Sequence, residues 1–337
     1  MPSRCAASIE ANCDGPPEAP SLPHRHSMHD TFAERILQLA SSDQRVVLLS
    51  GESSNGRFRQ FQEQIPERFF DCGSADTRLI NQAVGMALSG LRPVVYASVP
   101  ALTARCLEAI QSNICRHKAR VILVGAEAEA TSAGQPGGCR HDLALMRPLP
   151  NFAVACPADS VELRGVLRAS LGRTTATYIR LASPGAPRIH DDNLEFKFGR
   201  VITLRRGTDV CLVSTGDLLA EGLAAADILE RSGLSVEVVS SPTVKPLDGD
   251  WLDSAFDRFS TVVTLEDHGL LGGFGAAVAE WLADGVPHSA RLLRLGTPEV
   301  VFDVATEERL DRRAALQPQQ IAQQVLKRLK KRFRAVA

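Results

Sequence analysis

The chain contains few residue patterns that are typical of catalysis or phosphate binding. Gly272, Gly273 and Gly275 form a glycine cluster that would let backbone amides approach a phosphate, but such a cluster is more typical of close helix–sheet packing. We find no GxGxxG after a strand, no P-loop, no HExxH and no GxSxG. Any chemistry therefore depends on residues that the fold, and not a short motif, brings together.

The cysteines indicate a reducing compartment. They are scattered without a CxxC pair, so we expect neither a metal site in this chain nor a disulfide framework. Several lie in apolar surroundings and are interpreted as buried free thiols of a cytoplasmic protein. The eight cysteines are Cys5, Cys13, Cys72, Cys106, Cys115, Cys139, Cys156 and Cys211.

Charge and hydropathy argue against nucleic-acid and membrane partners. The 38 basic and 39 acidic residues leave a net charge of −1, which does not favour binding to polyanions. The basic cluster at residues 327–334 is interpreted as the solvated face of a terminal helix. No apolar run reaches the ~20 residues that span a bilayer, and the N-terminus lacks the apolar core of a signal peptide.

Alternating apolar and amphipathic stretches predict an α/β protein of two doubly wound domains with mostly parallel sheets. Residues 1–28 are Pro-rich and are expected to be a disordered tail. The Pro-containing segment 183–198 predicts a linker, so we expect domains over residues 29–188 and 189–337. Strands are expected at residues 46–49, 68–71, 93–96, 121–124, 152–154, 177–181, 210–214, 236–239, 261–265 and 290–295, and helices at 31–39, 77–88, 100–114, from 160, 216–231, 251–259, 273–283 and 318–333.

The order of several segments is the most specific signal in the sequence. The first half carries FFDCGSAD, VGMALSG, DLALMR, PN, PAD and YIRL, at residues 69–76, 84–90, 142–147, 150–151, 157–159 and 178–181. The second half carries GTDV, STG, SPTVKPLD and EDH, at residues 207–210, 214–216, 241–248 and 266–268. This order resembles the transketolase family from about residue 29 to the end.

The resemblance implies the pyrimidine-binding and C-terminal domains of an enzyme that uses thiamine diphosphate. Full-length members bind the diphosphate and its metal through a Gly-Asp-Gly … Asn motif in a further domain, which we do not find. A diphosphate needs a divalent ion, so the resemblance implies a partner chain that carries this domain and holds Mg²⁺. Split transketolases and 2-oxoacid dehydrogenase beta subunits are organised in this way. We expect a heterotetramer that self-associates through the C-terminal domain.

The resemblance also assigns cofactor contacts. The family's catalytic Glu, which favours the imino tautomer of the aminopyrimidine, corresponds to Asp76, one methylene shorter. The alternative is that Asp76 only caps the following helix. Val99 and Leu102 replace the aromatic residues on which the ring stacks, and Arg105 lies at a further cofactor position, with a solvated helix residue as the alternative.

Substrate contacts fall on three further residues. The family's catalytic His aligns with Gly137, so His141 and Arg140 are the nearby candidates for that role. Arg180 matches an Arg that binds the sugar phosphate, which suits the forked guanidinium, and a salt bridge at the strand end is the alternative. His268 matches an acidic-His pair for which a structural role is expected.

The sequence keeps some of the family's motif residues and changes others, which leaves several possible functions. We expect a subunit that transfers a two-carbon ketol unit from a ketose or 2-oxo donor to an acceptor, with a carrier protein in specialised biosynthesis as one candidate acceptor. The alternatives are a non-catalytic scaffold or regulator of an active homologue, a subunit like the beta chain of 2-oxoacid dehydrogenases, and a binding module without thiamine.

Overall fold

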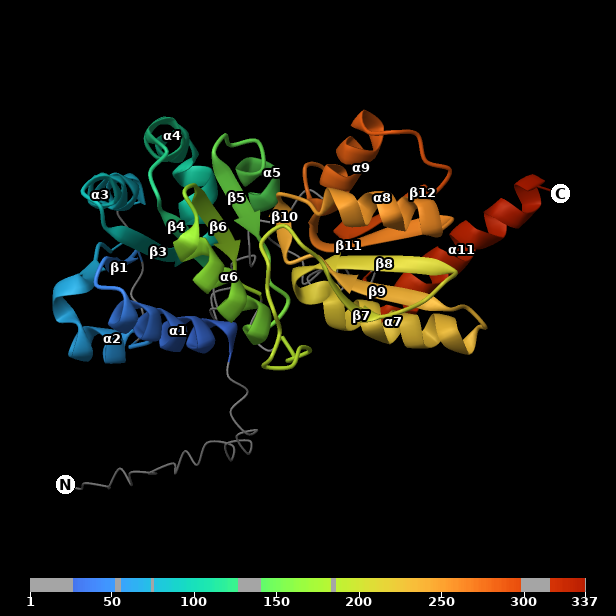
Figure 1. Cartoon of the computed structure of the whole chain (residues 1–337), viewed down its shortest axis with the longest axis horizontal. Helices are drawn as coiled ribbons and strands as arrows, with labels where there is room; N and C mark the ends of the chain where they lie inside the picture. Colours follow the sequence, from blue (N-terminus) through green and yellow to red (C-terminus); the bar gives the residue numbers. More distant parts are fainter. Residues whose placement is uncertain are drawn as a thin grey trace, which may run out of the picture.

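Two mostly parallel sheets lie side by side, and helices cover both faces of each (Figure 1). The structure is a computed structural model that describes residues 27–51, 56–73, 76–126, 141–182, 186–297 and 316–336. The α/β class predicted from the alternation of strands and helices is confirmed. Almost all of the expected tail, residues 1–28, lies outside the described part of the chain.

The first sheet has seven strands in the order β10-β5-β6-β4-β3-β1-β2. Six strands run parallel, because helical crossovers join them. Each coincides with an apolar run of the sequence, as expected for strands covered on both faces. They are β1 (Val46–Ser50), β2 (Phe69–Asp71), β3 (Arg92–Ser98), β4 (Ile122–Ala126), β5 (Phe152–Ala155) and β6 (Ala176–Arg180).

Two helical layers enclose this sheet. On one face, α1 (Met28–Ser42) and α6 (Ser160–Gly172) bury Phe32, Ile36 and Val166. On the other face lie α3 (Asp76–Leu88) and the helical stretch that follows β3. That stretch, predicted as one helix over residues 100–114, consists of π-helical turns η2 (Ala101–Arg105) and η3 (Ile110–Cys115) around α4 (Leu107–Ala109). Three short helical segments were not predicted: α2 (Arg59–Gln64), η1 (Pro66–Arg68) and α5 (Asp142–Met146).

The second sheet has five strands in the order β12-β11-β8-β9-β7. Its strands are β7 (Ile202–Arg205), β8 (Val210–Thr215), β9 (Val236–Ser240), β11 (Thr261–Gly269) and β12 (Arg291–Thr297). Only β7, which the sequence did not predict, runs antiparallel within it. One face is covered by α7 (Leu219–Arg231), which follows η4 (Gly216–Leu218), and by α11 (Pro318–Val336); the other is covered by α8 (Gly249–Arg258) and α9 (Phe274–Asp284).

The two halves of the chain share a sheet and a core. Strand β10 (Thr243–Lys245) comes from the second half but pairs antiparallel with β5 of the first sheet. One apolar cluster contains Leu123 from the first sheet and Val213 and Val262 from the second. The expected division at residue 188 stays a prediction, and the first sheet extends across it.

A buried carboxylate network fastens the connecting segment, residues 186–201, between the halves. Asp159 caps α6 and also accepts hydrogen bonds from the backbone N–H groups of Ile189 and His190, at 2.8 and 2.7 Å. Glu162, wholly buried, accepts from Ser240 Oγ on β9 at 2.6 Å and lies 3.3 Å from His190 Nε2. The network therefore joins α6, the connecting segment and the second sheet.

Proton uptake is linked to folding in this network. Burial raises the pKa of Glu162 to about 7, and the charge of His190 and the bond from Ser240 oppose the rise only in part. Burial alone would lower the pKa of His190, but the hydrogen bond to Asp159 and the charge of Glu162 outweigh it and raise that pKa. Both groups bind protons more tightly in the folded chain than in the unfolded one, so their contribution to stability falls as pH rises.

We predict that Glu162→Gln weakens the pH dependence of stability. Between pH 5 and pH 8 the free energy of unfolding of the wild-type chain should fall by on the order of 2 kcal/mol, because the buried Glu162 carboxyl ionises. The variant should not show this loss, because its amide cannot ionise. Urea unfolding at both pH values measures the difference. Glu63→Gln, at an exposed carboxylate of α2, is the control and should behave like wild type. Equal pH slopes for wild type and Glu162→Gln would contradict the linkage.

Candidate functional site

The sequence-predicted site residues that the structure describes lie at, or directly follow, the carboxyl edge of the first sheet. Strands β2, β3, β4 and β6 are parallel and end at this edge, where α/β proteins usually bind ligands. Asp76 is the first residue of α3, which follows the end of β2 after a turn at Gly73 with a φ of +56°. The backbone thus places Asp76 at the edge, and its side chain lies outside the described part.

The two expected ring contacts are buried inside the chain. Val99 and Leu102 are both 0% exposed, and Leu102 packs in the apolar cluster under α3. The Val99 carbonyl accepts a hydrogen bond from Thr103 Oγ1 at 2.7 Å, which holds the first turn of η2. Arg105, at the end of η2, is exposed. Contact of Val99, Leu102 or Arg105 with a cofactor stays a prediction.

His141 and Arg140 lie at the border of the described chain. Arg140 falls outside the described residues. His141 is exposed and precedes the first residue of α5, and its carbonyl accepts the Leu145 N–H at 3.0 Å. The structure therefore places His141 beside the carboxyl edge, with its backbone committed to the first turn of α5.

Arg180 lies at the end of β6 in a buried cluster. Its Nη1 donates to Asp142 Oδ1 at 2.6 Å, and Tyr178 OH donates to Asp142 Oδ2 at 2.8 Å. The three side chains are 3%, 0% and 0% exposed for Arg180, Asp142 and Tyr178. Burial and the Asp142 charge raise the pKa of the Tyr178 hydroxyl well above its usual range, so it stays protonated and donates. The salt bridge that the sequence left as the alternative for Arg180 is present.

Sequence reasoning missed Asp142, although a signal was available. Tyr178 and Arg180 are two residues apart on one strand, so their side chains share a face. Two donors on one buried face require an acceptor, and Asp142 is the acidic residue that opens the DLALMR segment. Gly125, paired with Arg180 across β4 and β6, leaves the space that the Tyr178 ring occupies, since a Cβ there would lie 2.5 Å from Tyr178 OH.

His268 lies where the two sheets meet and is 2% exposed. Its Nε2 is 3.9 Å from Cys156 Sγ, and its Nδ1 is 4.0 Å from Glu266 Oε2. Burial raises the pKa of the Cys156 thiol well above its ordinary value, so this cysteine is no nucleophile. The buried geometry agrees with the structural role expected of His268. All five cysteines of the described segments are free thiols.

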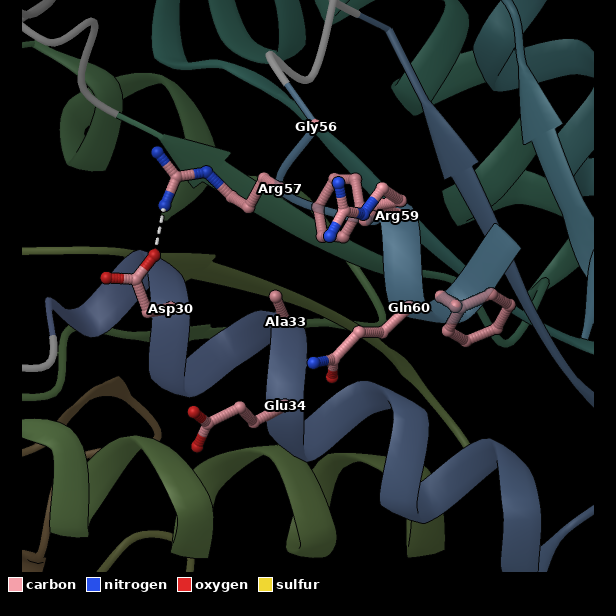
Figure 2. A pocket seen from close by; sticks show the side chains of 9 residues that line it. Asp30, Ala33, Glu34, Gly56, Arg57, Arg59 and Gln60 are labelled. Carbon is pink, nitrogen blue, oxygen red and sulfur yellow. Dashed lines mark hydrogen bonds and ion pairs between the residues drawn. The ribbon is translucent and has the colours of Figure 1, made fainter. Parts of the chain in front are cut away.

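A cavity of about 240 Å³ lies on the α1 side of the first sheet, between α1 and residues 56–61 (Figure 2). Arg57 Nη1 and Asp30 Oδ1 pair across its mouth at 2.9 Å. Charges of both signs line it, with Glu34 on the helix and Arg59 opposite. Of the predicted site residues whose side chains the structure describes, none lines this cavity.

Contact of the predicted site residues with the cofactor that the resemblance implies stays a prediction. The structure places the backbone of Asp76 at the start of α3. In the ranges that the structure describes, no group of three or more His, Cys, Asp or Glu side chains could hold a metal ion. A metal-bound diphosphate therefore finds no acidic ligand cluster in these ranges. Among the same residues, no helix has the length and apolar character needed to cross a membrane.

Two family descriptions match the chain. The transketolase pyrimidine-binding domain matches residues 25–184, and the transketolase C-terminal domain matches residues 199–321. A solved structure described as a split-gene transketolase, inactive β4 tetramer, superposes with a TM-score of 0.81 at 29% identity, covering 89% of this chain and 97% of that one.

Curated relatives are of two lengths. The chain is 33% identical to a 1-deoxy-D-xylulose-5-phosphate synthase of Thermomicrobium roseum over 92% of this chain and 49% of that protein. It thus spans about half the length of such synthases. It is 31% identical to the 6-deoxy-6-sulfo-D-fructose transketolase subunit SqwH of Clostridium sp. MSTE9, covering 92% of that subunit. It is 30% identical to a putative transketolase C-terminal section of Methanocaldococcus jannaschii, covering 96% of it.

We predict that Gly125→Ala destabilises the chain by about 1–3 kcal/mol, because the new methyl group would displace the Tyr178 hydroxyl from Asp142. Gly85→Ala is the control: Gly85 lies in α3 with nothing within 4 Å of an added Cβ, so alanine should be neutral or stabilise by up to about 1 kcal/mol. Urea unfolding of both variants measures this. A Gly125→Ala protein as stable as wild type would refute the close contact.

Proposed function

Because the chain belongs to the transketolase family, we propose that it is the pyrimidine-binding and C-terminal subunit of a two-component, thiamine-diphosphate-dependent transketolase-like enzyme. The observation that carries the proposal is the likeness to relatives described as a transketolase subunit and a C-terminal section, and to a solved split-gene transketolase. The chain covers nearly all of two relatives named as a transketolase subunit and a C-terminal section, but about half of the synthases. A separate subunit would then supply the remaining half.

The proposed role of the partner follows from electrostatics. A diphosphate carries several negative charges and is bound in proteins with a divalent cation held by oxygen ligands. The described residues of this chain offer no acidic cluster for such a cation. We therefore assign Mg²⁺ and the diphosphate to the partner, and the aminopyrimidine ring to the carboxyl edge of the first sheet. Two copies of each chain, with self-association through the C-terminal half, form the proposed assembly.

Asp76 is the proposed proton-handling residue. When bound, the cofactor supplies the carbanion chemistry, and the protein supplies binding and tuning. A carboxyl group at the start of α3 can hydrogen-bond a ring nitrogen and favour the imino tautomer. The described stretch 98–105 would form the apolar side of the ring site, with Val99 and Leu102 packed behind its surface and exposed Arg105 beside it.

The reaction that we propose is transfer of a two-carbon ketol unit from a ketose or 2-oxo donor to an acceptor, for which a carrier protein is one candidate. Arg140 and His141, which follow β4 in sequence, are the proposed substrate contacts. Arg180 is 3% exposed and bonded to Asp142. We therefore propose that it supports the two substrate-contact residues through Asp142 and does not contact the substrate itself.

A non-catalytic scaffold is the second candidate, and one observation favours it. Val99 and Leu102 are fully buried, so the chain by itself presents neither side chain to a ring. A scaffold would leave cofactor affinity of the partner independent of Asp76, whereas an enzyme subunit would make it dependent on Asp76.

We predict that Asp76→Ala abolishes turnover. In the co-expressed complex, loss of the carboxyl should lower kcat for ketol transfer at least ~100-fold, the lower end of the range for a removed acid–base group. Asp76→Glu should keep activity, since it restores the family's residue. Asp284→Ala, an exposed carboxylate at the end of α9, is the control. Unchanged turnover of Asp76→Ala would refute the catalytic role and favour the scaffold.

We also predict that the isolated chain binds thiamine diphosphate at least ~100-fold more weakly than the complex, a loss of about 3 kcal/mol, because the metal-bound diphosphate lacks its ligands. Calorimetric titration with and without Mg²⁺ measures both affinities. Chelation of Mg²⁺ should weaken binding to the complex and leave the isolated chain unaffected. Tight, Mg²⁺-dependent binding by the isolated chain would contradict the split-site proposal.

A further inference from the structure

Asp142 is a fully buried carboxylate held at both oxygens. Arg180 Nη1 bonds one oxygen at 2.6 Å, and Tyr178 OH bonds the other at 2.8 Å. Both donors extend from β6, a strand flanked by β4 and β5 inside the first sheet. A carboxylate is costly to remove from water unless donors compensate it, so this arrangement fixes the Asp142 side chain relative to the sheet.

The fixed side chain belongs to the first residue of α5. The same short helix buries Leu143 and Met146 in the apolar cluster. His141 comes immediately before it, with its carbonyl bonded to Leu145 N–H at 3.0 Å and its side chain exposed. The polar anchor and the apolar residues of α5 together leave the backbone of His141 little freedom, while its ring reaches solvent at the carboxyl edge.

We propose that Asp142 is a positioning residue for His141. The cluster of Asp142, Tyr178 and Arg180, here called the β6 anchor, holds the start of α5 so that the His141 imidazole is presented at the carboxyl edge of the first sheet. The inference rests on the proposed function, because it gives His141 a part in the reaction. It also gives Arg180 a task different from direct contact with the substrate.

The charge on Asp142 matters to this task. An amide of the same shape accepts through only one of its two terminal atoms. In Asp142→Asn the amide oxygen can still accept from Arg180, but the amide NH2 then faces Tyr178 OH, which must change from donor to acceptor. Arg180 would then be a buried cation without the compensation of Asp142. Displacement of a reacting group by about 1 Å can cost on the order of 100-fold in rate, so a small shift of α5 is enough to be measured.

The anchor itself is tested in the isolated chain by amide hydrogen exchange. Asp142→Asn should speed exchange in residues 143–146 by about tenfold, as expected for the loss of ~1.4 kcal/mol of local stability, and leave residues 161–170 of α6 unchanged. Tyr178→Phe, which keeps the ion pair, should have a smaller effect in the same direction. Asp192→Asn, at an exposed ion pair, is the matched control.

The positioning role is tested in the co-expressed complex by a double-mutant cycle with His141→Ala. Asp142→Asn should lower kcat by roughly 10- to 100-fold, the range for residues that orient a reacting group. On the His141→Ala background the same change should lower kcat by less than about twofold, because the two residues then act through one group. Thermal unfolding of each variant separates loss of fold from loss of rate.

Faster exchange together with a non-additive cycle supports the proposal. Unchanged exchange in residues 143–146 overturns the anchor. An Asp142→Asn effect on kcat that persists without His141 overturns the positioning role and leaves a purely structural cluster. If Asp142→Asn does not fold, Tyr178→Phe gives the same two readouts. A wild-type complex that does not turn over a ketose or 2-oxo donor overturns the proposed function and the role of His141 with it, whatever the exchange shows.

Discussion

A carboxylate that is removed from water must find hydrogen-bond donors, and this requirement organises the interior of the chain. Asp142 is compensated by two side chains of β6. Glu266 accepts from the backbone N–H groups of Phe274 and Gly275, which fixes the start of α9 against β11. Asp142 is the first residue of α5, and Glu266 lies within β11 and bonds the first turn of α9. The hydrogen bonds to these buried acids therefore fix where α5 and α9 begin relative to the two sheets.

The same requirement joins the two halves. Glu162 on α6 bonds Ser240 on β9, and Asp159 holds the connecting segment. A basic pair reinforces this contact: Arg147 donates to the carbonyl of Gly272, and Lys245 donates to the carbonyl of Arg147. Together with β10, which pairs with β5, these bonds connect the first sheet to the second.

Membership in the family is better supported than the roles of the individual site residues. Membership in the transketolase family rests on matches along most of the chain. The proposed site is less conventional: the carboxyl residue that we propose for it is an aspartate, the apolar residues expected to contact the ring are buried, and the arginine expected at the substrate is paired with Asp142. A subunit that provides one side of a site, and relies on a partner for the diphosphate, accounts for both observations.

Strand and helix types follow from sequence alone, because apolar runs and amphipathic periods encode local burial. Residues 46–49, 152–154 and 236–239 form strands, and a helix begins at residue 160, as predicted. Strands β7 and β10 were not predicted, because both are short and their pairing depends on distant parts of the chain. The order of family motifs likewise predicted the two family domains that the chain matches.

The roles of individual site residues needed tertiary structure. Arg180 reads from sequence as a substrate ligand or a salt bridge, and only the approach of Asp142, 38 residues away, shows that the ion pair forms. In the sequence, His141 is a lone histidine. Only the tertiary structure shows that the β6 anchor holds the backbone next to it. Long-range contacts of this kind depend on how helices return to a sheet, which local residue patterns do not specify.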